Sequence, residues 1–156
     1  MTSADAARPS TAQASVAVPT GTASGPGRAL VAVYAILALA AGARSAVQVL
    51  TDWDAAPLAY GLSAVAAGVY VVATFALARG IGAWRPIAWA AVSTELVGVV
   101  AVGTLSVARP ALFADATVWS GFGVGYGFVP LVLPVLGMLW LRRTRTKVPS
   151  LGASPR

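Results

Sequence analysis

Four long stretches of this sequence are almost free of charge: residues 29–50, 57–78, 87–108 and 118–141. Arg44 and Glu95 are the only charged residues that they contain. An apolar run of about 20 residues matches the hydrocarbon thickness of a bilayer. A soluble domain of 156 residues has too small an interior to bury four such runs completely. The sequence therefore predicts an all-α fold, a polytopic membrane protein whose four transmembrane helices form a bundle.

Prolines and polar segments set the ends of the four predicted helices, which we place at about 29–50, 57–78, 86–108 and 118–141. Pro57 and Pro86 suit the first turn of a helix, where the amide hydrogen that proline lacks would have no partner. Residues 1–27 are mainly Ala, Ser, Thr, Pro and Gly, a composition typical of a disordered tail. The predicted organisation is this tail, a transmembrane domain at 28–142 and a basic tail at 143–156.

Basic residues are distributed unevenly between the two predicted sides of the membrane. Nine of them fall in the two tails and the second loop, whereas the first and third loops together contain only Arg109. Since basic segments next to a span are retained in the cytoplasm, both tails should be cytoplasmic and the protein should lie in the cell membrane. Arg28 and the apolar run after it also resemble a signal peptide, but the segment before Arg28 is too long for one. Tryptophans at the span ends support the topology, because an indole ring favours the headgroup level: Trp53, Trp84, Trp119 and Trp140.

The sequence contains neither histidine nor cysteine, which excludes several kinds of site. It cannot form a thiolate nucleophile, a Cys/His zinc site, a haem ligated by either residue or a histidine proton relay. We therefore expect no cofactor and no enzymatic activity. A membrane enzyme is the least favoured of the functions considered below. It would rest on Asp52, Asp54 and Asp115, which fall in the two outer loops, because carboxylates can bind a divalent cation. The net charge of +6 comes from basic residues that border the hydrophobic spans, where they set the orientation in the membrane. We therefore expect no nucleic-acid partner.

Arg44 and Glu95 are expected to face the interior of the bundle, because a charge in the hydrocarbon costs at least about 2.5–3.5 kcal/mol. At 1.5 Å per residue, Glu95 lies about 12 Å and Arg44 about 22 Å from the predicted inner ends of their helices. A helical side chain points toward the N-terminus of its helix, so the Arg44 side chain points back toward the level of Glu95. A modest offset of the two helices would then bring Arg44 and Glu95 into contact. The sequence leaves open whether they pair directly.

Further polar residues complete a candidate intramembrane site. Gln48 lies one turn beyond the arginine, and the second predicted helix has a stripe of hydroxyl groups that includes Ser63, Tyr70 and Thr74. These residues could line a small cavity. Alternatively, the hydroxyls bond to carbonyls of their own helix, and the arginine and glutamate form a buried structural ion pair. If Glu95 has no such partner, burial favours its protonated form, and a proton-coupled role becomes the better hypothesis.

Glycine occupies every second position at the start of the fourth predicted helix: Gly121, Gly123, Gly125 and Gly127. As a helix, this segment would present small-xxx-small patterns on two nearly opposite faces, where neighbouring helices can approach closely. Pro130 and Pro134 follow and remove two backbone hydrogen bonds, so this helix should be the least regular of the four. The glycines predict packing against another copy of the chain or a larger membrane complex.

The segment 118–143, together with Ala43–Gln48 and the third helix with its glutamate, resembles a group of small four-span actinobacterial membrane proteins of uncharacterised function. The resemblance covers about residues 29–143 and implies no catalytic residue. From the sequence, we favour a non-enzymatic integral membrane protein that packs with itself or a larger complex in the lipid bilayer. The alternative is a small-solute or proton-coupled carrier that uses a pair formed by Arg44 and Glu95.

Overall fold

The computed structural model describes residues 25–80 and 82–144, and every regular element in these ranges is helical. Four α-helices follow one another along the chain: α1 (Pro26–Thr51), α2 (Pro57–Arg79), α3 (Trp84–Ala108) and α4 (Val129–Arg143). Three short 3-10 segments lie in the connections: η1 (Trp53–Ala55) between α1 and α2, and both η2 (Pro110–Leu112) and η3 (Ser120–Tyr126) between α3 and α4. The all-α prediction is confirmed for these ranges. Most of the two predicted tails, at 1–24 and 145–156, lies outside the described residues.

The first three predicted helices agree with α1, α2 and α3 to within three residues at each end. Proline occupies the first turn of α1 and of α2, as its missing amide hydrogen favours. Gly80 ends α2 in the left-handed conformation, with φ 56°, that commonly closes a helix. All three helices are long and apolar enough to cross a membrane.

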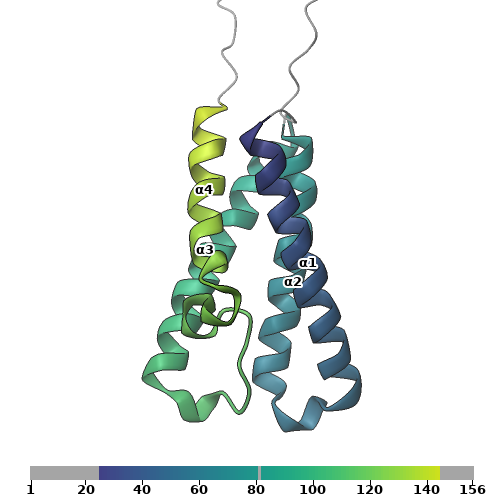
Figure 1. Cartoon of the computed structure of the whole chain (residues 1–156), viewed down its shortest axis with the longest axis vertical. Helices are drawn as coiled ribbons and strands as arrows, with labels where there is room; N and C mark the ends of the chain where they lie inside the picture. The colour runs from purple at the N-terminus through teal and green to yellow at the C-terminus, as the bar shows by residue number, and fades with distance from the viewer. Residues whose placement is uncertain (1–24, 81, 145–156) are drawn as a thin grey trace, which may run out of the picture.

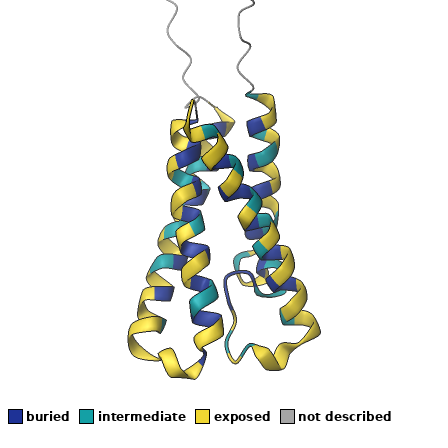
Figure 2. Ribbon diagram, turned by 180° about the vertical axis from the view of Figure 1, so that it is seen from behind, coloured by how far each residue is buried: buried dark blue, intermediate teal, exposed yellow. Residues whose placement is uncertain are grey.

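The helices run side by side, with the start of α1 and the end of α4 at the same end of the bundle (Figure 1). α1 packs most extensively against α2, α2 packs against α3, and α3 packs against both η3 and α4. Figure 2 shows buried positions where helices face one another and many exposed positions around them. Large apolar side chains are exposed there, which suits an environment of hydrocarbon better than water: they include Leu39, Val65, Phe75 and Val97.

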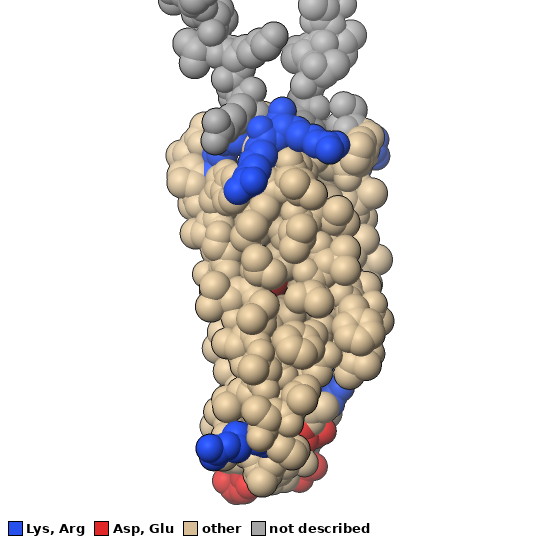
Figure 3. All heavy atoms as spheres, turned by 90° about the vertical axis from the view of Figure 1, so that its left-hand side faces the viewer, with Lys and Arg blue, Asp and Glu red and all other residues tan. Residues whose placement is uncertain are grey.

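Charged groups gather at the two ends of the bundle and leave an apolar belt between them (Figure 3). We call the end at which α1 starts and α4 ends the arginine end, after Arg28, Arg79, Arg85, Arg142 and Arg143. We call the opposite end the acidic end, after Asp52, Asp54 and Asp115. This separation is the pattern that a bilayer imposes on a protein that spans it.

At the arginine end, Arg85 of α3 stabilises the last turn of α4. Its guanidinium donates hydrogen bonds to the carbonyl oxygens of Leu141 and Thr144. These carbonyls have no partner inside the helix, and a cation there also favours the helix dipole. Arg79 lies over the ring of Trp84, 4.3 Å from its centroid. Basic residues that the sequence connects only with topology therefore also hold helix ends together.

The prediction of one continuous fourth helix is wrong, because η3 and α4 meet at a bend of 97°. Three consecutive residues of η3, Gly121, Phe122 and Gly123, have left-handed φ angles of 54°, 60° and 82°. α4 alone has 15 residues and a length of about 22 Å, less than the hydrocarbon thickness of about 30 Å. The structure therefore has three helices that can span a membrane, or four spans if η3 and α4 together form one.

The alternating glycines explain the break. A left-handed conformation costs other residues about 1–2 kcal/mol but costs glycine nothing, so a glycine-rich segment can turn where a helix would continue. Gly123 also allows a close approach, because a Cβ atom at this position would lie 2.8 Å from a ring carbon of Pro130. Pro130 itself stands in the first turn of α4. The alternating glycines therefore form a turn, and not the helix with two faces of small residues that the sequence predicts.

Candidate functional site

A carboxyl group lies near the middle of the apolar belt. Glu95 of α3 is fully buried, and its Oε2 accepts a hydrogen bond of 2.6 Å from the phenol of Tyr34 in α1. Its Oε1 has no hydrogen-bond partner among the described residues. Tyr70 of α2 lies beside Tyr34, with ring centroids 6.3 Å apart, and its hydroxyl accepts a hydrogen bond of 3.0 Å from the indole N–H of Trp119. We call these four residues the Glu95 centre.

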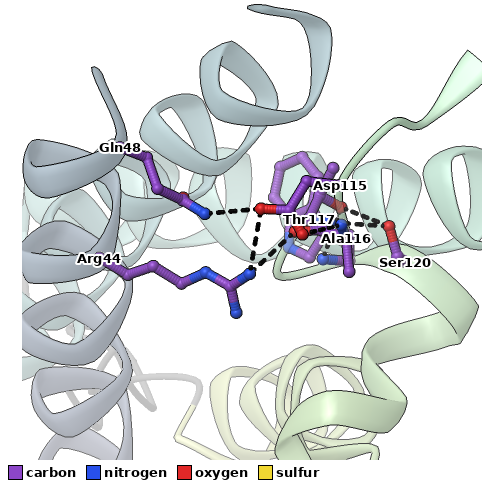
Figure 4. Close-up of polar contacts among 7 residues, drawn as sticks. Arg44, Gln48, Asp115, Ala116, Thr117 and Ser120 are labelled. Carbon is purple, nitrogen blue, oxygen red and sulfur yellow. Dashed lines mark hydrogen bonds and ion pairs between the residues drawn. The ribbon is translucent and has the colours of Figure 1, made fainter. Parts of the chain in front are cut away.

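A second polar group lies toward the acidic end (Figure 4). Arg44 and Gln48 extend from α1 toward the segment that follows η2, where Gln48 Nε2 donates a hydrogen bond of 2.9 Å to Asp115 Oδ2. The Arg44 guanidinium lies 3.7 Å from the same carboxylate oxygen and donates a hydrogen bond of 3.3 Å to the carbonyl of Ala116. The side chains of Arg44 and Asp115 are 40% and 37% exposed, so this ion pair is open to the surroundings of the bundle. We call Arg44, Gln48 and Asp115 the Arg44 centre.

An open cavity of about 430 Å³ adjoins the Arg44 centre. Arg44 and Asp115 contribute a cation and a carboxylate to its wall, and η3 contributes Ser120, Tyr126, Val124 and two glycines. The hydroxyls of Ser120 and Thr117, which also line it, lie 3.0 Å apart and hold the entry to η3 in place. This volume falls in the range of small-molecule sites, about 300–1,000 Å³. Charges of both signs together with hydroxyl groups suit a small polar solute.

Arg44 and Glu95 do not form the direct pair that the sequence left open. Tyr34 is the residue of α1 that contacts Glu95, and Arg44 follows it by ten residues, about 15 Å along the helix. Arg44 pairs instead with Asp115, at the acidic end. The intramembrane carboxyl group therefore has a phenol as its neighbour in place of a cation.

The other predicted site residues have different surroundings. Gln48 joins the Arg44 centre and Tyr70 joins the Glu95 centre. Ser63 is buried, and its hydroxyl has no partner within the described ranges. Thr74 donates a hydrogen bond of 2.7 Å to the carbonyl of Tyr70 in its own helix, which is the structural role that hydroxyl groups often have in membrane helices. The hydroxyl groups of the predicted stripe therefore do not line one common surface.

Trp119 connects the two centres. It follows Asp115 by four residues, it is 3% exposed, and its ring covers Gly98 of α3. A Cβ atom on Gly98 would lie 2.6 Å from the ring, so only glycine leaves room for it. The predicted headgroup position of Trp119 is therefore wrong, because its indole lies in the core and bonds to Tyr70.

Within the chain itself, the glycines of the fourth span do not pack against a neighbouring helix as two small faces. Gly123 is buried against the chain's own Pro130, whereas Gly125 and Gly127 are exposed and have open space around an added Cβ atom. The glycine that receives a side chain from η3 is Gly103 of α3, where an added Cβ would lie 2.6 Å from the ring of Phe122. Close approach therefore depends on Gly98 and Gly103 of α3.

Sequence reasoning missed Tyr34, although a signal was present. Tyr34 lies five residues from the predicted start of its helix, which is a depth of about 7 Å. This depth is closer to that of Glu95, about 12 Å, than the depth of Arg44, about 22 Å. Asp115 was assigned to the outer carboxylates, and nothing in its neighbours indicates that it would pair with Arg44. Among the described residues, no group of three carboxylates lies close enough to hold a metal ion.

A comparison with known proteins finds no match: no family model, no curated protein and no solved structure is significantly similar to this chain. The resemblance to small actinobacterial four-span proteins therefore stays a prediction. The function must be argued from the Glu95 centre, the Arg44 centre and the segment that joins them.

Proposed function

We propose that this chain is a small proton-coupled carrier of a polar solute, with Glu95 as its proton site. The observation that carries the proposal is a fully buried carboxyl group in an apolar belt whose hydrogen-bond partner is a phenol. A charge in the hydrocarbon costs at least about 2.5–3.5 kcal/mol, and intramembrane carboxyl groups mark proton and ion pathways in membrane proteins. This role needs neither a cofactor nor enzymatic activity.

Tyr34 makes two protonation states of Glu95 compatible with the same contact. A phenol can donate a hydrogen bond to a carboxylate, and its oxygen can accept one from a carboxylic acid. The second oxygen, Oε1, has no partner among the described residues and is free to receive a proton. An arginine in the place of Tyr34 would hold the carboxylate in its charged form instead.

The solute site in this proposal is the cavity beside the Arg44 centre. Thr117 and Ser120 line the cavity, and Trp119, which lies between them in the sequence, reaches Tyr70 of the Glu95 centre. A solute that takes over the contacts of Arg44 with Asp115 and Ala116 would move this segment and the indole with it. Secondary transporters commonly bind their substrates where a transmembrane helix is discontinuous, because half-helix ends and unwound backbone offer polar groups there.

We further propose that the arginine end faces the cytoplasm and the acidic end faces outward across the cell membrane, since basic residues next to spans are retained inside. The chain has no cysteine, so single cysteines can be introduced as topology probes. In intact cells, a membrane-impermeant maleimide should label an Asp54→Cys variant and should leave a Thr144→Cys variant unlabelled until the cells are opened. The reverse pattern would invert the topology.

The proton site can be tested before the solute is identified. A hydrophobic carbodiimide reacts with a protonated carboxyl group inside a membrane, and the product is measured as a mass increase on the peptide that contains Glu95. The labelled fraction should fall as the pH is raised, because only the protonated form reacts, and Glu95→Gln should abolish labelling. Labelling that is absent at every pH, or that does not change with pH, would mean that Glu95 does not exchange protons with water.

The same reaction serves to find the solute. A panel of amino acids, short carboxylic acids and small amines is added before the carbodiimide. Because such solutes also consume the reagent in solution, a solute that binds is one that changes the labelling of Glu95 in the wild type and not in an Arg44→Gln variant. In proteoliposomes with an entrapped pH dye, that solute should drive a proton flux that Glu95→Gln abolishes and that Arg44→Gln weakens through a poorer solute affinity. A proton flux that survives Glu95→Gln would refute the assignment of the proton site.

A second candidate is the non-enzymatic packing role favoured by the sequence. It is supported by Gly125 and Gly127, which are exposed with open space around an added Cβ atom and lie next to the exposed Val124 and Phe128. Gly125 and Val124 also line the cavity beside the Arg44 centre. Replacing Gly125 with leucine should then reduce association with another copy or a partner complex, as measured by native mass spectrometry after mild extraction. An unchanged complex, or a protein that is monomeric from the start, would exclude this surface as the interface.

A further inference from the structure

An apolar groove of about 450 Å³ runs between α1 and α4 at the arginine end. Each helix contributes one stripe at helical spacing, Pro26, Ala29, Leu30 and Val33 from α1 and Leu133, Leu136, Leu139, Trp140 and Arg143 from α4. The contact between these two helices is sparse compared with that between α1 and α2. Leu136 and Leu139 are 49% and 44% exposed, so the groove opens to the surroundings of the bundle.

The length of the groove matches the depth of one leaflet of a bilayer. From Leu133 to Arg143, the stripe on α4 extends about 15 Å along the helix axis, which is half of the hydrocarbon thickness and thus the depth of one leaflet. The groove is lined almost entirely by apolar side chains over this length, which suits a hydrocarbon chain that lies along the two helices.

The mouth of the groove is positively charged. Arg143 lines it directly, beside Trp140, whose amphipathic ring suits the headgroup level. Further arginines surround this end of the bundle, and the acidic residues of the described ranges other than Glu95 lie at the opposite end (Figure 3). Basic pockets between membrane helices are typical binding places for anionic headgroups.

We propose that this groove binds an anionic phospholipid, with one acyl chain between α1 and α4 and its phosphate at Arg143. The lipid comes from the leaflet at the arginine end. Its acyl chain fills the space where α1 and α4 make few contacts with each other. The proposal is independent of the proton-coupled role, because the groove and the cavity of the Arg44 centre lie at opposite ends of the bundle.

The test is native mass spectrometry of the full chain from nanodiscs that contain phosphatidylglycerol and phosphatidylcholine with equal acyl chains. The wild type should retain one lipid with a preference for phosphatidylglycerol. Arg143→Gln should reduce this preference by about fivefold, the contribution expected of one basic residue at an anionic surface, and Arg142→Gln is the matched control outside the groove. Leu136→Trp should fill the groove and lower the retention of both lipids, whereas Val135→Trp, on the neighbouring face of α4, should not.

Several outcomes would overturn the proposal. Equal retention by Leu136→Trp and Val135→Trp would mean that the retained lipid lies elsewhere on the bundle. Equal preferences of the Arg143→Gln and Arg142→Gln variants would remove the headgroup contact. The wild type could instead form a dimer without bound lipid. If only Leu136→Trp dissociates that dimer, the groove binds a second copy of the chain. Thermal unfolding of each variant in detergent shows whether it is folded, and an unfolded Leu136→Trp is replaced by the smaller change Leu136→Phe.

Discussion

The Glu95 centre and the Arg44 centre each contain one carboxyl group, but in different surroundings. Glu95, Tyr34 and Tyr70 are all fully buried, whereas the charged side chains of the Arg44 centre are more than one-third exposed. A buried polar group that loses its partner keeps its full desolvation cost, but water replaces the partner of an exposed ion. Substitutions should therefore affect stability strongly at the first centre and weakly at the second. A weakly held ion pair is also the one that a solute can displace.

The contact between Trp119 and Gly98 should give the largest effect, because it joins the two centres. Gly98→Leu places side-chain atoms where the indole lies, and the overpacking should cost about 3 kcal/mol or more in the free energy of unfolding. Denaturant titration in detergent micelles, followed by circular dichroism, measures this cost. The matched control is Gly68→Leu in α2, where an added Cβ meets nothing within 4 Å. Equal stabilities of the two variants would mean that the indole is not confined against α3.

The buried hydrogen bond of Glu95 should give the next largest effect. Tyr34→Phe removes the donor and leaves both carboxyl oxygens without a partner among the described residues, at a cost of about 1–3 kcal/mol. Replacing both partners by apolar groups of similar shape can be nearly neutral, so the double variant with Glu95→Met should be more stable than Tyr34→Phe alone. The same denaturant titration provides all the values of this double-mutant cycle. Additive costs in the cycle would show that the two side chains do not interact in solution.

The first three helices and the apolar belt follow from the sequence, because hydrophobic length is a local property that needs no tertiary information. Pro57, for example, is both the predicted and the observed start of its helix. Pairing within the belt was harder to predict, since it depends on relative helix depth and rotation. The depth of Tyr34 along its helix is closer to that of Glu95 than the depth of Arg44 is, whereas opposite charge favours Arg44 as the partner of a buried carboxylate.

The fourth span could not be predicted for a different reason. The spacing of Gly121, Gly123, Gly125 and Gly127 fits both a helix with two small faces and a turn, and local propensity does not distinguish them. The choice depends on Gly98 and Gly103 of α3, which accept Trp119 and Phe122. Such contacts between residues far apart in the chain leave no local pattern.

The exposed ion pair should give the smallest effect and completes the comparison. Arg44→Gln and Asp115→Asn should each change the free energy of unfolding by less than about 1 kcal/mol, as exposed ion pairs do. At about 1 M salt, where the screening length is about 3 Å, this difference should shrink further. The cost of Tyr34→Phe should not respond to salt, because both partners are buried. The same titration at low and high salt separates the two centres. A large, salt-independent effect of Arg44→Gln would show that Arg44 is fixed in the fold, and a fixed Arg44 could not exchange Asp115 for a solute.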